Sequence, residues 1–255
     1  MKKFIASVMF ALAASTLVVS GSAYANEAGP ELEPANVDIH NQASLQNGAK
    51  YFANYCMGCH SLGFSRYNRI AKDMGVSEEQ VAKNLIFTRT DGEPTKVGEL
   101  MKNGISQKDA AEWFGAPPPD LTLDARVRGS DWIYTYLKSF YKDKTRPMGV
   151  NNTVFPNVGM PHVLWELQGI QEKVCTKEGE GEHAAEHCEL KLVKQGSMNP
   201  TEYDKVARDI TAFLTYVSEP AQLHRKLYGI GVILFLILFA GVAYLLKKEY
   251  WKDVH

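Results

Sequence analysis

The sequence predicts a mostly α-helical domain with long loops, followed by one carboxy-terminal transmembrane helix. Residue patterns that start helices recur through the middle of the chain, while the alternation of apolar and polar residues that is typical of strands does not persist for long. The amino terminus has the form of a secretory signal, and a late segment of twenty residues carries no charged side chain. The protein is therefore expected to be exported and held at a membrane.

The amino-terminal segment, residues 1–25, is predicted to be a cleaved secretory signal. Lys2 and Lys3 precede an apolar run from Phe4 to Val19, and the run is followed by the small residues that signal peptidase requires, at Ala23 to Ala25. The alternative is a signal anchor that stays in the membrane. Cleavage removes two lysines and changes the formal net charge from −1 to −3, so the mature chain lacks the strongly basic character expected of a nucleic-acid-binding protein.

Residues Cys56 to His60 form a C-x-x-C-H motif. Two thiols at this spacing can each add to a vinyl group of one haem, and the following histidine then lies under the iron as an axial ligand. The same cysteines could instead form a thioredoxin-like redox pair, which needs a βαβ setting, or half of a zinc site, which needs a second ligand cluster. The flanking residues offer neither, and export would bring the thiols to haem outside the cytoplasm. The motif therefore predicts covalent attachment of one haem c.

A helix is expected to deliver Cys56 to the haem. Ser44 can cap this helix, which would run to about Tyr55 with apolar residues at helical spacing on one side. Gly48 lies on that side, where it either permits the close approach of another helix or is a tolerated glycine.

Three more helix starts follow the motif. Ser77 to Gln80 is a capping box, and Ser106 begins a helix that Gly115 ends. Ser130 begins another helix. Between them, Pro117 to Leu121 is predicted to form a stiff extended wall, because its three prolines donate no amide hydrogen bonds. Irregular loops are expected to join these helices.

Asn199 to Glu202 is a strong helix start, with an asparagine cap, a proline at the first helical position and a glutamate that reaches back. The apolar residues between Tyr203 and Val217 then form one face of the helix. This face is predicted to pack on the first helix of the domain. The alternative is an amphipathic helix that lies on the membrane surface.

The segment from Leu227 to Leu246 is predicted to cross the membrane. Its twenty uncharged residues would span about 30 Å as a helix, which matches the hydrocarbon core of a bilayer. Aromatic residues lie near its ends, and Lys247 and Lys248 follow it as cytoplasmic anchors. The expected layout is an exported haem domain at 26–222, a membrane anchor at 223–246 and a cytoplasmic tail at 247–255.

A haem with one histidine ligand carries electrons if a second side chain binds the iron, and it is open to catalysis if none does. Met160 is the favoured second ligand, because Gly159 and Pro161 on either side would hold it in a rigid loop. A loop methionine is more often a packing residue, however, so this assignment stays open on spacing alone. His162 is the nearest rival, and bis-histidine ligation would give a lower reduction potential.

Five features in order along the chain together resemble the cytochrome c1 family. They are the motif at Cys56 to His60, the segment Pro118 to Leu121, Arg126-x-Arg128, Gly159-Met160-Pro161 and the carboxy-terminal anchor. The resemblance extends over essentially the whole mature chain. It implies a cytochrome c-like haem domain with long loop insertions, which would serve as the haem c subunit of a bacterial cytochrome bc1 complex.

The resemblance also implies a role for each matching residue. Cys56 and Cys59 would hold the haem, and His60 and Met160 would ligate its iron. Pro118 and Pro119 would line the haem pocket, and Arg128 would pair with a haem propionate. On sequence grounds alone, the arginine could equally be an ordinary surface base.

By the same resemblance, the subunit would take an electron from the Rieske iron–sulfur protein and pass it to a soluble periplasmic carrier such as cytochrome c. It would do so in a dimeric quinol:cytochrome c oxidoreductase that includes cytochrome b, in the bacterial inner membrane, with the haem domain in the periplasm and no bond-making active site of its own. Two alternatives remain: a membrane-anchored cytochrome c that serves a terminal oxidase, and a haem enzyme with an open distal site.

An acidic insert between Cys175 and Cys188 departs from the shorter family pattern. In an oxidising compartment these two cysteines are expected to form a disulfide. Zinc bound by His183, His187 and Cys188 is the alternative. The acidic residues either form a solvated loop or attract a basic electron acceptor.

Overall fold

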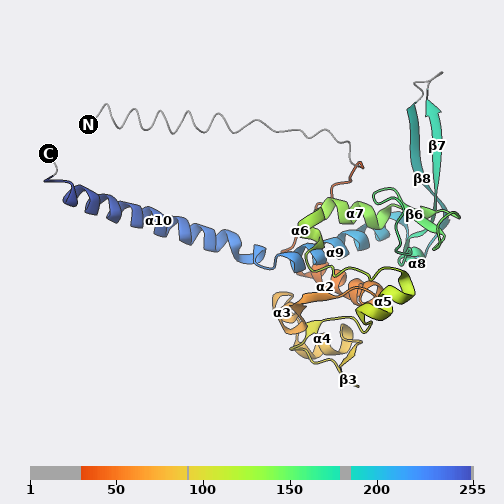
Figure 1. Cartoon of the computed structure of the whole chain (residues 1–255), viewed down its shortest axis with the longest axis horizontal. Coiled ribbons are helices and arrows are strands. Elements are labelled where there is room, and N and C mark those ends of the chain that lie inside the picture. The colour runs from red at the N-terminus through yellow and green to blue at the C-terminus, as the bar shows by residue number, and fades with distance from the viewer. Residues whose placement is uncertain (1–29, 91, 179–184, 254–255) are drawn as a thin grey trace. The chain divides into compact units, whose positions relative to one another are not determined.

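The computed structural model describes residues 30–90, 92–178 and 185–253 (Figure 1). The predicted signal sequence at 1–25 lies outside the described residues. The helical segments are α2 (Gln42–Tyr51), the π-helical segment η1 (Phe52–Cys56), α3 (Tyr67–Asp73), α4 (Glu78–Asn84), α5 (Gln107–Phe114), α6 (Asp124–Arg128), α7 (Ser130–Lys138), α8 (Trp165–Gln168), α9 (Pro200–Ser218) and α10 (Gln222–Tyr250). The prediction of a mostly helical protein is confirmed.

Within the described residues, the strands form only two-stranded antiparallel sheets. They are β1 (Leu62–Arg66) with β4 (Leu100–Met101), β2 (Arg89–Thr90) with β3 (Glu93–Pro94), β5 (Phe140–Lys142) with β6 (Val150–Asn152), and β7 (Gly169–Glu178) with β8 (Ala185–Gln195). The strands of the first three pairs are short, with two to five residues each.

The packing of α2 against α9 organises the core (Figure 1). A Cβ atom added to Gly48 would lie 2.0 Å from the backbone oxygen of Asp209, so only glycine permits this approach. The buried carboxylate of Asp209 accepts hydrogen bonds from Ser44 Oγ at 2.5 Å and from Asn47 Nδ2 at 2.6 Å. The predictions that the α9 face packs on the first helix and that Gly48 allows close contact are both confirmed.

Both predicted capping boxes are present, and they begin α4 and α9. Ser77 Oγ accepts from Gln80 N at 3.1 Å while Gln80 Oε1 accepts from Ser77 N at 2.9 Å, and Asn199 and Glu202 exchange the same two bonds at 2.9 Å each. These helix starts depend only on residues within one turn, which explains why the sequence predicts them well.

The cap of α5 is also as predicted. Ser106 Oγ accepts a hydrogen bond from Asp109 N at 3.1 Å, and Gly115 ends the helix with a left-handed φ of 77°.

Two other predicted caps are wrong. The cap of α2 is Asn41, whose side chain accepts from Ser44 N at 3.2 Å, and the Ser44 hydroxyl instead donates to Asp209. The helix α7 follows directly from α6 through Gly129, at a φ of 92°, with no side-chain cap from Ser130. At α2 a neighbouring asparagine takes the place of the expected serine, and at α7 no side chain caps the helix.

The segment before α2 forms an extended arm across α7 and α9. Glu33 N donates to Thr135 Oγ1 at 2.9 Å, and Ala35 N donates to Asp131 Oδ1 at 2.8 Å. Arg208 Nε donates to Ala35 O at 2.9 Å. These bonds satisfy the backbone of the arm without any regular secondary structure.

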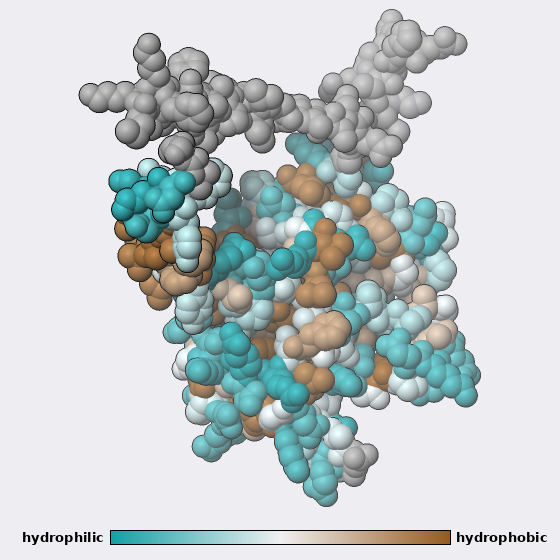
Figure 2. Space-filling model, turned by 60° about the vertical axis from the view of Figure 1, so that its left-hand side comes forward, coloured by the Kyte–Doolittle hydropathy of each residue, from teal (hydrophilic) through white to brown (hydrophobic). Residues whose placement is uncertain are grey.

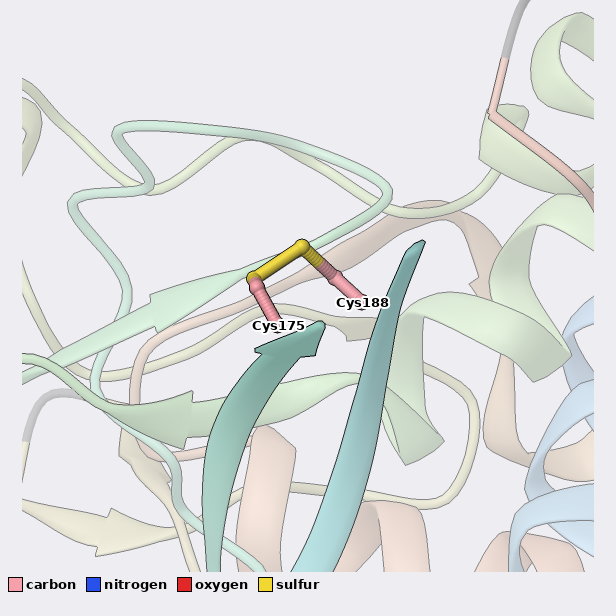
Figure 3. Close-up of a disulfide and its surroundings, with 2 residues drawn as sticks. All are labelled: Cys175 and Cys188. Atoms are coloured by element: carbon pink, nitrogen blue, oxygen red, sulfur yellow. A yellow bond between two sulfur atoms is a disulfide. The ribbon is translucent and has the colours of Figure 1, made fainter. Parts of the chain in front are cut away.

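The expectation of loops without sheet is wrong for the described ends of the acidic insert, which belong to the β7–β8 hairpin. Apolar Cys188, Leu190 and Leu192 do alternate with polar residues on β8, but this pattern ends at Val193 and does not appear along β7. Cys175 lies directly opposite Cys188 in the pairing, and a disulfide joins them (Figure 3). The disulfide prediction is confirmed.

The same bond rules out the zinc alternative as stated, because that alternative needs the thiolate of Cys188. His183 lies outside the described residues, as do Glu180 and Glu182 of the insert.

At its base, the hairpin is fastened to the helical core. Gln171 Nε2 donates to the backbone oxygens of Lys138 and Phe140 at 2.8 and 3.0 Å. Gly169 has a φ of 101°, and a Cβ atom there would lie 2.1 Å from Lys194 O, so the first residue of β7 must be glycine.

The helix α10 has the length and composition of a membrane span. At about 1.5 Å per residue its 29 residues extend about 44 Å, which exceeds the hydrocarbon core of a bilayer. All large apolar side chains between Leu227 and Leu246 are exposed, and hydrophobic residues dominate this helix in the space-filling view (Figure 2). A helix that exposes apolar side chains on every side is suited to lipid.

Candidate haem site

The C-x-x-C-H motif begins inside a helix and ends in a tight turn. In η1 each backbone N–H bonds to the carbonyl oxygen five residues earlier, one more than in an α-helix, as Met57 N does to Phe52 O at 2.9 Å. Cys59 N and His60 N then both donate to Cys56 O, at 3.0 and 2.9 Å. Both sulfur atoms and the imidazole are therefore carried by one short turn of the backbone. Cys56 is buried, Cys59 is half-buried, and both are free thiols.

The ring of His60 is buried and held from the side opposite to a possible ligand bond. Its Nδ1 lies 2.8 Å from Pro119 O. Because a carbonyl oxygen can only accept, Nδ1 carries the proton and Nε2 keeps its lone pair. Burial lowers the pKa of His60, and the bond to Pro119 and the charges of Asp124 and Asp120 oppose that fall. The imidazole is therefore a neutral donor that is oriented to bind a metal through Nε2.

The proline segment reaches His60 because it is tied to the chain that follows the motif. Leu121 N donates to Ser61 O at 3.0 Å, and Gly63 N donates to Asp120 Oδ2 at 2.6 Å. On the other side, Asn103 Nδ2 donates to Cys59 O. Pro118 is half-buried and Pro119 is exposed. The stiff segment predicted from the sequence thus presents a backbone oxygen to the ring of His60.

Met160 lies in a loop that is held by hydrogen bonds from several residues earlier in the chain. Arg146 Nη1 and Nη2 donate to Asn157 Oδ1 and Asn157 O, at 3.1 and 3.0 Å. Asn157 N donates to Asn151 Oδ1 at 2.8 Å, and Asn157 itself has a left-handed φ of 64°. The hydroxyl of Tyr136 donates to Met160 Sδ at 3.3 Å. The sulfur atom is therefore held in place by its own hydrogen bond as well as by its loop.

His162, the rival of Met160, is buried and packs flat on Phe140 with ring centroids 4.9 Å apart. Burial lowers its pKa to about 4, and nearby Gln168 opposes this fall. Its Nε2 has no hydrogen-bond partner, although the atom is buried. The contacts of His162 are those of a packed aromatic residue.

A row of side chains at four-residue spacing connects Arg128 with the Met160 loop. The guanidinium of Arg128 lies 4.2 Å from the ring centre of Trp132, and it also pairs with Asp124 at 3.1 Å. The ring of Trp132 stacks on Tyr136 at 4.9 Å, and Tyr136 meets Phe140 edge to face at 5.1 Å. Sequence reasoning missed the roles of Trp132 and Tyr136. The repeat at i, i+4 along α6, α7 and β5 was the available signal.

Asp124 links the two sides of the site. Burial has the largest effect on both groups, lowering the pKa of His60 and raising that of Tyr136, and in each case the negative charge of Asp124 raises the pKa. The carboxylate therefore lies within electrostatic reach of the His60 ring and of the hydroxyl that holds Met160. The structure thus groups the cysteines, His60 and Pro119 by direct contacts, and it groups Arg128 and Met160 through the aromatic row.

These residues fit a covalently bound haem. Two free thiols precede a neutral histidine whose Nε2 is available, and a thioether is presented from a separate, fastened loop. Within the described residues, no group of three or more His, Cys, Asp or Glu side chains could hold a metal ion. An imidazole nitrogen and a thioether sulfur are both donor types that bind haem iron.

Comparison with known proteins agrees with this chemistry. A model of the cytochrome c1 family matches residues 35–254. Cytochrome c1 of Allochromatium vinosum is 52% identical over the full length of both chains. A protein of Nitrosomonas europaea named ammonia monooxygenase gamma subunit is 43% identical over 91% of this chain and 93% of its own.

A third relative is longer than this chain. The cytochrome b/c1 of Bradyrhizobium diazoefficiens is 29% identical over 99% of this chain and 41% of its own. Proteins of the family carry a covalently bound haem c and are anchored in the membrane, in a complex with cytochrome b. The chain belongs to the cytochrome c1 family and is an electron-transfer subunit of a cytochrome bc1 complex.

Proposed function

We propose that Cys56 and Cys59 bind the haem covalently and that His60 and Met160 are the axial ligands of its iron. When bound, the haem supplies a one-electron couple between ferric and ferrous iron. The observation that carries the assignment is the hydrogen-bonded state of the two candidate ligands. His60 Nδ1 is occupied by Pro119 O at 2.8 Å, and Met160 Sδ accepts from Tyr136 at 3.3 Å.

In this assignment the protein keeps both ligands in the same place while the electron arrives and leaves. The bond to Pro119 fixes the ring plane and the tautomer of His60. Arg146 and Asn151 fix the loop before Met160 through Asn157. A site whose ligands are already positioned needs little rearrangement when the charge on the iron changes.

The remaining pocket residues are proposed on the same basis. Pro118 and Pro119 would line the haem face next to His60, since the segment that carries them is tied to Ser61 and Gly63. Arg128 would pair with a haem propionate. Its guanidinium is 39% exposed, and its pair with Asp124 uses only the Nε donor, so other donors remain for a carboxylate.

For the electron path, we infer that the donor is the Rieske iron–sulfur protein and the acceptor is a soluble periplasmic carrier such as cytochrome c. The haem domain at 26–222 would then lie in the periplasm and residues 247–255 in the cytoplasm of a bacterial cell, with the complex forming a dimer. The predicted secretory signal supports this orientation, whereas Arg225 and Lys226 before the apolar segment offset Lys247 and Lys248 after it.

The test of ligation is a redox titration of the full-length protein in detergent. Met160→Leu should lower the midpoint potential by on the order of 100 mV, within the range of about 0.8 V over which axial ligands set haem potentials. His162→Leu is the matched control, and it should keep the potential near that of the wild type. An unchanged potential in Met160→Leu, or the larger fall in His162→Leu, would exclude Met160 as the ligand.

The test of the electron path is the identity of the subunits that copurify. Recovery with cytochrome b and a Rieske protein supports the path above. Recovery with a copper or haem oxidase would support the alternative of an oxidase-linked cytochrome. Tight binding of cyanide to the resting ferric protein would support a haem enzyme with an open distal position.

A further inference from the structure

The hydroxyl of Tyr136 is the donor to the sulfur atom of Met160, because a thioether sulfur can only accept. We propose that this hydrogen bond tunes the iron–sulfur bond and thereby raises the reduction potential, so that Tyr136 is a positioning residue for the redox centre. The proposal rests on Met160 being an axial ligand, as set out above. It adds a residue that contacts neither the iron nor the covalent attachment.

The ring of Tyr136 is held on both sides, so its hydroxyl has a fixed direction. Trp132 stacks on it with an angle of 9° between the ring planes, and Phe140 contacts it edge to face. Its backbone is fixed as well, since Asn152 Nδ2 donates to Tyr136 O at 2.8 Å. The donor is therefore positioned by α7 and its neighbours and does not depend on the loop that carries Met160.

The chemistry of a thioether allows both bonds at once. The sulfur has two lone pairs, and it can give one to the iron and accept a hydrogen bond at the other. Accepting the bond draws electron density away from the sulfur. This weakens the bond from Met160 to ferric iron more than the bond to ferrous iron. The ferrous state is then favoured, and the potential rises.

The test compares Tyr136→Phe with the wild type by redox titration of the full-length protein. The variant keeps the ring and its stacking on Trp132 but lacks the hydroxyl. Loss of one ordinary hydrogen bond should lower the equilibrium constant for reduction about threefold, which is about 28 mV at about 59 mV per decade. Tyr134→Phe is the matched control, because it removes a hydroxyl from the same helix that donates instead to Asp204.

A second measurement separates tuning from simple support of the loop. Imidazole displaces a methionine ligand from ferric haem, so its affinity reports how firmly Met160 is bound. If Tyr136 weakens the bond to ferric iron, Tyr136→Phe should bind imidazole with equal or lower affinity and keep the red absorption band of methionine-ligated ferric haem. A lower potential accompanied by tighter imidazole binding would mean that the hydroxyl only holds the loop, and it would overturn the proposal.

The failure of this proposal can be told from the failure of the ligand assignment. An unchanged potential in Tyr136→Phe, with a normal red band in the wild type, overturns the tuning role and leaves Met160 as the ligand. A wild type without the red band, whose potential does not respond to Met160→Leu, overturns the ligand assignment itself.

Discussion

The two sides of the haem site are built in different ways. On the His60 side, both thiols and the imidazole lie within five consecutive residues, and one tight turn brings them together. On the other side, the proposed ligand Met160 stands alone in its loop and depends on Tyr136, Arg146 and Asn151 for its position. The first arrangement is a local property of the backbone, and the second is a product of tertiary contacts.

This difference teaches which substitutions should abolish the site and which should only tune it. Loss of a residue in the motif removes a covalent bond or a ligand, with nothing to replace it. Loss of a contact around Met160 leaves the thioether in the chain and changes only how firmly it is held. The following three predictions test that contrast, in order of decreasing effect.

The largest effect is expected from Cys56→Ala combined with Cys59→Ala. The variant should lose covalently bound haem completely, because both thioether bonds are gone. The measurement is haem staining after denaturing electrophoresis of the full-length protein. As a control, Cys175→Ala with Cys188→Ala removes the hairpin disulfide, which also consists of two cysteines, and should keep full staining. Equal staining in the two variants would mean that the haem is attached elsewhere.

An intermediate effect is expected from Gly48→Ala. This substitution tests whether the helix that leads to the motif depends on its packing against α9. The new Cβ would lie 2.0 Å from Asp209 O, so α2 and α9 must move apart. Overpacking of this kind costs about 1–3 kcal/mol, and thermal unfolding of the full-length protein should show a lower midpoint.

Gly104→Ala provides the control for that substitution, because nothing lies within 4 Å of the added Cβ. Its midpoint should equal that of the wild type. If Gly48→Ala proved as stable as this control, the tight packing of α2 on α9 would not matter for the domain.

The smallest effect is expected from Arg146→Ala, which loosens the Met160 loop without touching the ligand. The loop loses two hydrogen bonds to Asn157, at 3.0 and 3.1 Å. A cost of about 1 kcal/mol should raise the affinity of the ferric protein for imidazole about fivefold, as measured by optical titration. Arg89→Ala, which removes a similar bond to the loop oxygen of Gly92, should leave this affinity unchanged. If Arg146→Ala also had no effect, the contrast between the two sides would be weaker than the contacts indicate.

Much of the fold could be predicted because it depends on neighbours in the sequence. The capping boxes at Ser77 and Asn199 involve residues three positions apart, and the sequence predicts both. The cap of α2 was predicted wrongly, because the Ser44 hydroxyl is bound by Asp209, which lies 165 residues away. The β7–β8 hairpin was missed because the alternation that identifies a strand extends only from Cys188 to Leu192 on β8 and does not appear along β7.

The candidate site divides in the same way. The sequence by itself determined the haem motif and the membrane span, since each depends on a contiguous pattern of residue types, whereas spacing alone left both Met160 and His162 as candidates for the second ligand. Only the tertiary structure decided that Pro119 binds the ring of His60 and that Tyr136 binds the sulfur of Met160. These contacts join residues 59 and 24 positions apart. A spacing pattern carries no information about which distant atoms come within hydrogen-bonding distance, and packing alone fixes that choice.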